Sequence, residues 1–177
     1  MKKGFTMIEL IFVIVILGIL ASVAIPRLAA TREDAEISAT VANLRTLVSD
    51  ASAYYTAKGT FDTNTKWNEI TNVPITVSGT DTKAVGDSAT AHLKVGGANC
   101  IGVALVNKNG NAPAHIKFTK DGTNSSKGVC KEVLDSAPVK AYIESKVSNG
   151  TSTAISDAMA IGSSTSVYQT TATTTKP

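Results

Sequence analysis

Residues 2–27 read KKGFTMIELIFVIVILGILASVAIPR, and the fold depends on this stretch. The 21 residues from Phe5 to Ile25 would span roughly 31 Å as a helix, at about 1.5 Å per residue. This length matches the hydrocarbon core of a bilayer. Glu9 alone interrupts the apolar run with an ionisable group, and a charge near the bilayer centre costs about 2.5 to 3.5 kcal/mol. Glu9 is therefore expected to have a partner.

An ordinary signal peptide or a single-span anchor is the simplest alternative interpretation, with Glu9 reaching into the lipid headgroups. However, the small residue Gly4 lies before the apolar run, and no clean small-x-small cleavage site ends that run. The nearest match is SVA at residues 22–24, and the helical pattern continues past it. Both features disfavour a secretory signal.

The nine residues KKGFTMIEL at positions 2–10 resemble the class III signal and first helical turns of type IV prepilins and type II secretion pseudopilins. The resemblance extends over residues 1–59. It rests on the basic pair, the glycine, the phenylalanine with a glutamate four residues later, the apolar run and Pro26. It implies a structural subunit that forms a homo-oligomeric helical filament and needs no active site and no cofactor.

The resemblance also assigns roles to individual residues. A membrane prepilin peptidase would cut between Gly4 and Phe5 and methylate the new amino group of Phe5. Glu9 would pair with the Phe5 ammonium of a neighbouring subunit in the filament core, where an unpaired charge is costly. The stretch from Gly18 to Pro26 is expected to kink, because proline removes a helical hydrogen bond, or to lose helicity in the filament.

The expected localisation follows from the same segment. Lys2 and Lys3 precede the apolar run, and this favours a cytoplasmic amino terminus. The precursor is expected in the bacterial inner membrane, with its head in the periplasm, and the mature subunit in an extracellular filament. An inner-membrane platform protein and an assembly ATPase are the further partners that the resemblance implies.

The remaining chain predicts an α+β fold, and the resemblance implies that this is the pilin fold, with a long, kinked, half-hydrophobic helix packed on a small antiparallel sheet. Its expected parts are a leader (1–4), a membrane or filament-core helix (5–26), an amphipathic second half of that helix (27–59) and a head (60–177). The helix would end near Lys58 and Gly59, because glycine readily adopts the left-handed conformation that terminates helices. Its apolar stripe is spaced by alternating steps of four and three residues: Ile37, Val41, Leu44, Val48, Ala51 and Tyr55.

The head is expected to contain a small antiparallel sheet that packs on this stripe. Alternating or continuous apolar residues predict strands at 91–95, 101–106 and 115–119. Residues 60–89 are expected to form a polar connection with scattered apolar anchors, in which Pro74 argues against a central strand. These anchors are Phe61, Trp67, Ile70, Val73 and Ile75.

The carboxy-terminal part is expected to be bounded by a disulfide. Cys100 and Cys130 are the only cysteines, and both lie on the proposed outer side, where an oxidising compartment permits a bridge. Two buried thiols or half of a metal site are the alternatives.

A second helix is expected to follow the disulfide-bounded region and to end at Asn149 and Gly150. Pro138 would lie in its first turn. The apolar face of this helix comprises Val139, Tyr142, Ile143 and Val147. Residues 148–177 are rich in Ser and Thr and are expected to form a tail with a disordered tip. Within it, residues 158–168 are expected to add an edge strand or wrap the sheet.

The sequence lacks the patterns of an enzyme. It has no phosphate-binding glycine motif, no nucleophile elbow and no carboxylate cluster with metal-ligand spacing. His92 and His115 are expected to be polar strand residues that face solvent or a loop. The stretch from Asp121 to Asn124 resembles the start of a calcium loop but lacks its later acidic ligands, so no metal site is predicted.

Two alternative functions remain open. A pseudopilin of type II secretion would share the amino-terminal motif, but the metal-poor, Ser/Thr-rich end favours a pilin, since major pseudopilins often hold calcium there. A minor pilin that binds DNA or a surface would need a basic patch, whereas the net charge of +3 falls to +1 once Lys2 and Lys3 are removed. The lysines that could contribute are Lys94, Lys108, Lys117, Lys120, Lys127 and Lys131.

Overall fold

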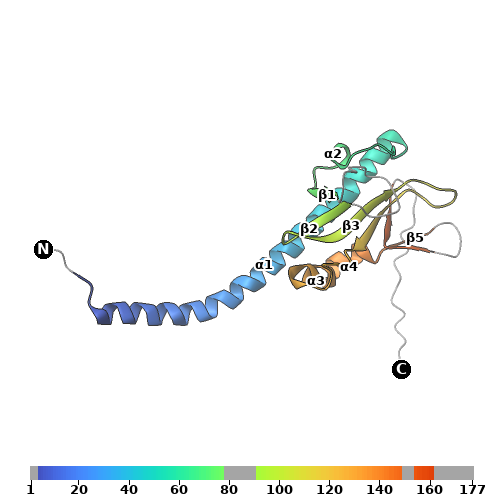
Figure 1. Ribbon diagram of the computed structural model, residues 1–177. Helices are drawn as coiled ribbons and strands as arrows, with labels where there is room; N and C mark the ends of the chain where they lie inside the picture. The colour runs from blue at the N-terminus through green and yellow to red at the C-terminus, as the bar shows by residue number, and fades with distance from the viewer. Residues whose placement is uncertain (1–3, 78–90, 149–153, 162–177) are drawn as a thin grey trace, which may run out of the picture. The chain divides into compact units, whose positions relative to one another are not determined.

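The computed structural model describes residues 4–77, 91–148 and 154–161 (Figure 1). It divides into two compact units, Met1–Ala35 and Glu36–Pro177. Asn149, Gly150 and the Ser/Thr-rich tail beyond residue 161 lie outside the described residues.

The first unit contains most of the apolar part of helix α1, which runs from Met7 to Lys58. Every large apolar side chain from Phe5 to Leu28 is exposed, and the least exposed of them, Ile16, still exposes 40% of its surface. Pro26 lies inside α1. No described side chain in this part of the helix is buried.

The second unit is built on a five-stranded antiparallel sheet with the strand order β1-β2-β3-β4-β7. A two-stranded sheet of β5 and β6 accompanies it. The strands are β1 (Ile75–Val77), β2 (Ala91–Val95), β3 (Ala98–Val106), β4 (His115–Lys120), β5 (Lys146–Ser148), β6 (Ala154–Ser156) and β7 (Ala158–Ala160). The three predicted strands are confirmed as β2, β3 and β4.

Strand β3 begins three residues before the predicted start because a tight turn joins it directly to β2. Gly96 and Gly97 both have positive φ angles, 57° and 86°, and Val95 pairs with Ala98. Two central residues with positive φ suit the right-handed twist of a hairpin, and glycine adopts them without a steric penalty. The expected edge strand after Ala158 is confirmed as β7, which pairs with β4.

Three short helices complete the second unit: α2 (Trp67–Ile70), α3 (Gly128–Asp135) and α4 (Ala137–Ile143). Helix α4 confirms the predicted second helix, with Pro138 in its first turn. The predictions that this helix includes Val147 and ends at Asn149 and Gly150 were wrong, because α4 ends at Ile143 and Val147 belongs to β5. The carbonyl of Ser145 accepts a hydrogen bond from Ala158 N–H at 3.0 Å. This contact with a distant residue takes the place of a helical hydrogen bond, so the residues after Ile143 do not continue the helix.

The connection after α1 is more ordered than predicted, since it contains α2 and the edge strand β1. Pro74 directly precedes β1, in agreement with its exclusion from a central strand. The side chain of Asn107 fastens this connection to the end of β3: its Oδ1 accepts from Phe61 N–H at 2.7 Å, and its Nδ2 donates to the Phe61 carbonyl at 2.7 Å. Four of the five predicted anchors are buried: Phe61, Trp67, Ile70 and Val73.

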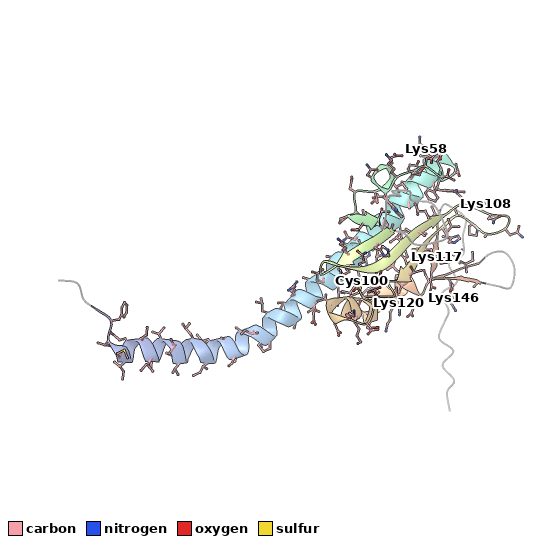
Figure 2. All side chains as sticks on the ribbon, viewed as in Figure 1. Lys58, Cys100, Lys108, Lys117, Lys120 and Lys146 are labelled. Atoms are coloured by element: carbon pink, nitrogen blue, oxygen red, sulfur yellow. A yellow bond between two sulfur atoms is a disulfide. The ribbon has the colours of Figure 1, made fainter. Side chains whose placement is uncertain are left out.

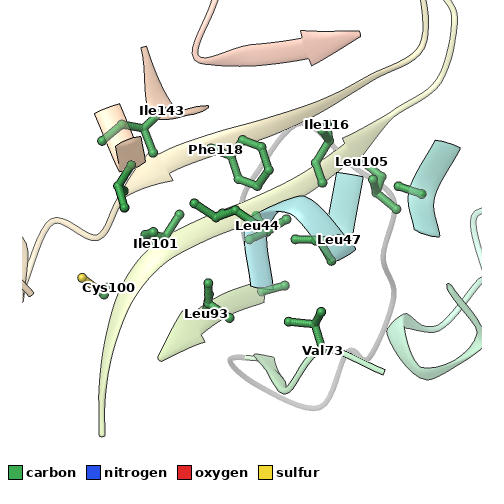
Figure 3. Close-up of a cluster of buried hydrophobic side chains, with 14 of the residues drawn as sticks. Leu44, Leu47, Val73, Leu93, Cys100, Ile101, Leu105, Ile116, Phe118 and Ile143 are labelled. Atoms are coloured by element: carbon green, nitrogen blue, oxygen red, sulfur yellow. The ribbon is translucent and has the colours of Figure 1, made fainter. Parts of the chain in front are cut away.

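The core lies between the second half of α1 and one face of the sheet, as predicted (Figure 3). Leu44 and Leu47 of α1 point toward the sheet and are fully buried. Leu47 was missing from the predicted stripe, because a helix against a sheet buries a wider face than steps of four and three describe. The sheet contributes Leu93, Ile101, Leu105, Ile116 and Phe118.

The predicted disulfide is confirmed. Cys100 lies in β3 and Cys130 in α3, their Cα atoms are 5.6 Å apart, and both side chains are buried. The bridge joins the central strand to a helix that the sequence did not predict. It therefore fixes the carboxy-terminal region to the sheet.

Candidate functional site

The amino-terminal end of α1 is capped by the side chains of Thr6 and Glu9. The backbone N–H of Thr6 donates to Glu9 Oε2 at 2.8 Å, and the Thr6 hydroxyl donates to the same oxygen at 2.6 Å. The Glu9 N–H points back to Thr6 Oγ1 at 3.4 Å. This reciprocal arrangement is a capping box, and it places the carboxylate at the positive end of the helix dipole.

Thr6 is a site residue that the sequence interpretation missed. A threonine three residues before a glutamate, just ahead of an apolar run, is itself a signal for a capping box and was available in the sequence. The capping box shows that Glu9 has polar partners within its own chain. Among the described residues, its second oxygen, Oε1, takes part in no hydrogen bond.

Gly4 and Phe5 lie immediately before α1 and outside regular structure. Phe5 exposes 91% of its surface, and a Cβ atom added to Gly4 would meet no other atom within 4 Å. The peptide bond between these two residues is therefore open to an enzyme. Gly18 is likewise surrounded by open space, within α1.

The apolar run gives α1 the character of a membrane segment. Its most apolar 18-residue window has a mean hydropathy of 2.9 and buries nothing. Within the described parts of the chain, α1 is the one helix whose length and composition would allow it to cross a membrane. Helix and signal motif together are consistent with a membrane-anchored precursor.

The two histidines belong to the second unit and differ in their surroundings. His115 lies in β4 and was predicted to face solvent or a loop. It does not face solvent, since it exposes only 4% of its surface, but its Nδ1 lies 2.9 Å from the carbonyl of Pro113 in the preceding loop. Its burial follows from the edge strand β7, whose Ala160 pairs with His115. His92 lies near Asp121, with Nδ1 and Oδ2 3.4 Å apart.

The loop that resembles the start of a calcium site is held by hydrogen bonds of its own. Asp121 Oδ1 accepts from the backbone N–H groups of Thr123 and Asn124 at 2.9 and 3.0 Å. In the part of the chain that the structure describes, no cluster of three or more His, Cys, Asp or Glu side chains could hold a metal ion.

The lysines proposed for a DNA-binding alternative lie on strands of the sheet, in loops and, for Lys131, in α3. Figure 2 shows Lys108 near the loop after β3, while Lys117 and Lys120 lie on β4. Binding of single strands also needs exposed aromatic rings on which bases stack. Phe61, Trp67 and Phe118 are buried in the core, so these three rings are not available for stacking.

The amino-terminal sequence matches a known family model. Residues 1–25 match the family model described as the prokaryotic N-terminal methylation motif, the class III signal peptide of type IV pilins and pseudopilins. The match supports a pilin-like or pseudopilin precursor and points to a structural family that is usually non-enzymatic. No curated protein and no solved structure was found to match the chain.

Proposed function

We propose that this chain is the structural subunit of a bacterial type IV pilus-like surface filament, cut between Gly4 and Phe5, methylated at Phe5 and polymerised through α1. The observation that carries the proposal is the exposed apolar surface that directly follows the methylation motif. From Phe5 to Leu28 every large apolar side chain is exposed by 40 to 91%. Such a continuous surface requires lipid or other protein to cover it.

Lipid and protein cover apolar side chains about equally well, so leaving the membrane for a filament gains little hydrophobic free energy. Polar contacts are therefore needed to favour one arrangement of subunits. Glu9 supplies such a contact, since a carboxylate in a low-dielectric core must be paired. Its pairing with a neighbour's Phe5 ammonium would fix the register at which each subunit enters.

The capping box lets Glu9 keep polar contacts both in the membrane and in the filament. Thr6 occupies Oε2 and reduces the cost of keeping the carboxylate in an apolar environment before assembly. Oε1 is left to accept the ammonium of an incoming neighbour. Glu9 therefore need not break its contacts with Thr6 in order to pair between subunits.

The proposed topology has a cytoplasmic amino terminus and a periplasmic head, residues 60–177. The disulfide between Cys100 and Cys130 supports an oxidising compartment for the head. Prepilin peptidase, a platform protein and an assembly ATPase would process the subunit and extract it from the membrane. In this proposal the chain is the substrate of processing and extraction and catalyses neither step.

The experiment that tests the proposal replaces the charge of Glu9. Glu9→Val removes a polar group from the apolar segment, so membrane insertion and processing are expected to be unchanged. Filament yield in sheared surface fractions should fall at least about tenfold, since a lost charge pair of about 1.4 kcal/mol or more has this effect. Glu69→Val, at an exposed position of α2, is the matched control. Normal filament yield from Glu9→Val would refute the pairing role.

A further inference from the structure

The second unit contains an open groove of about 830 Å³ between α1 and the segment from α4 to β5. Its floor is apolar and formed by half-buried side chains: Val41, Val48, Tyr142 and Met159. Charged side chains surround this floor: Arg45, Lys140, Glu144 and Lys146. The groove therefore combines an apolar base with a rim that carries three cations and one carboxylate.

The rim has spare positive charge. Among the described residues, neither Arg45 nor Lys146 has a carboxylate within 4.0 Å. Lys140 lies 3.6 Å from Asp135, which Lys131 also contacts at 3.2 Å. The Lys131 hydrogen bond holds the pKa of Asp135 below its usual range, so this carboxylate stays ionised and balances Lys131. The groove lining keeps a net charge of +2.

The complementary charge lies on α1 itself. Residues 32–36 read REDAE and carry one cation and three carboxylates, a net charge of −2. Glu33, Asp34 and Glu36 are exposed or half-buried, and in the described parts of the chain none of them has a cation within 4.0 Å. Ala30 is three and four residues before Glu33 and Asp34, so these three share one helix face that is small, apolar and acidic.

Among the described residues, Glu36 makes no ion pair with Arg45, Lys140 or Lys146 of its own chain. Glu36 precedes Arg45 by nine residues on the same helix, which separates them by about 13.5 Å along the axis. Glu33 and Asp34 come earlier in the sequence. Because ion pairs need about 4 Å or less, Glu36 and Arg45 of one copy cannot pair with each other, and both are available to a second copy.

We propose that the groove binds residues 30–36 of α1 from a second copy of this chain. The acidic side chains of one copy would face Arg45 and Lys146 of the other, and Ala30 would rest on the apolar floor. The proposal rests on the proposed function, since a filament repeats one contact between identical copies. It adds a polar contact outside the membrane-length segment that orients each subunit about its helix.

Engineered cysteines test the contact directly in cells. The full chain is given Asp34→Cys and Lys146→Cys together, and membranes and sheared fractions are analysed without reductant. A ladder of crosslinked dimers and larger species is expected, and it should be absent from either single variant. The pair Asp34→Cys and Lys108→Cys is the matched control, because Lys108 is exposed and lies outside the groove.

Charge reversal supplies a second readout that does not depend on new thiols. Arg45→Glu with Lys146→Glu is expected to lower filament yield roughly tenfold, since like charges replace a complementary pair. Adding Glu33→Lys and Asp34→Lys should restore the yield to within about threefold, because the two surfaces are complementary again.

The outcomes separate this contact from the proposed function. Filaments without a ladder, together with normal yield from the Arg45 and Lys146 reversal, overturn the groove contact and leave the pilin proposal standing. A ladder in membranes of cells that make no filaments supports the contact and overturns the pilin proposal. Neither ladder nor filaments overturns both.

Discussion

Leu17 and Leu47 lie on the same helix and have opposite surroundings. Leu17 exposes 58% of its surface, whereas Leu47 exposes none. The first is surrounded by other exposed apolar side chains, and the second packs against a sheet of its own chain (Figure 3). One helix therefore carries two kinds of apolar surface. One is buried against the sheet of its own chain, and the other is exposed and available to lipid or neighbouring subunits.

This difference separates stability from assembly. Side chains around Leu47 should determine whether the second unit stays folded, because folding buries them. Side chains around Leu17 should affect only what the chain does in a membrane or filament. The sole tryptophan, Trp67, is 5% exposed and therefore reports unfolding of the second unit by its fluorescence.

The largest expected effect comes from truncating the two leucines in parallel. Leu47→Ala should lower the free energy of unfolding by about 3 to 5 kcal/mol, because it removes buried methyl groups and leaves a cavity. Leu17→Ala should leave this free energy unchanged. Denaturant unfolding of the processed chain in detergent, followed by Trp67 fluorescence, measures both. Equal losses from the two variants would show that the two parts of α1 are not energetically distinct.

Removal of the disulfide is expected to have the next largest effect, again confined to the second unit. Replacing Cys100 and Cys130 by alanine should lower the free energy of unfolding by roughly 2 to 4 kcal/mol, because the bridge joins residues that are 30 apart in the sequence and so restricts the unfolded chain. The same unfolding assay measures the loss. Reductant should destabilise the wild-type chain by a similar amount and have no effect on the double variant. A stable double variant would contradict the structural role of the bridge.

A smaller effect is expected at Asn107, which tests a single polar contact. Asn107→Ala should cost about 1 to 3 kcal/mol, since it leaves the backbone N–H and carbonyl of Phe61 without their partner. Asn109→Ala, in the same loop and exposed, is the control and should change stability by less than about 0.5 kcal/mol. Equal values for the two variants would show that Asn107 does not hold the connection.

The parts of the fold that the sequence predicted are those with local signals. The end of α1 followed from Gly59, whose φ angle is 73° and whose N–H bonds to the Tyr55 carbonyl at 2.7 Å. The alternation at Ile116 and Phe118 predicted β4, and Pro138 indicated the start of α4. These features depend on the residues themselves and on their immediate neighbours.

The parts that the sequence did not predict depend on distant contacts. Helix α3 is fixed through Cys130, and β1 exists only by pairing with β2. Val147 continues a helical pattern, but the contact between Ser145 and Ala158 redirects it into a strand. The capping box of Thr6 and Glu9 is the exception, because its residues are only three apart and their spacing is a local signal that was not used.

The most direct test of the account is electron microscopy of sheared surface fractions from cells that express the wild-type chain, with the intact mass of the filament protein. We expect long fibres whose subunit lacks residues 1–4 and begins at a methylated Phe5. A chain that keeps residues 1–4 or forms no fibres would contradict it.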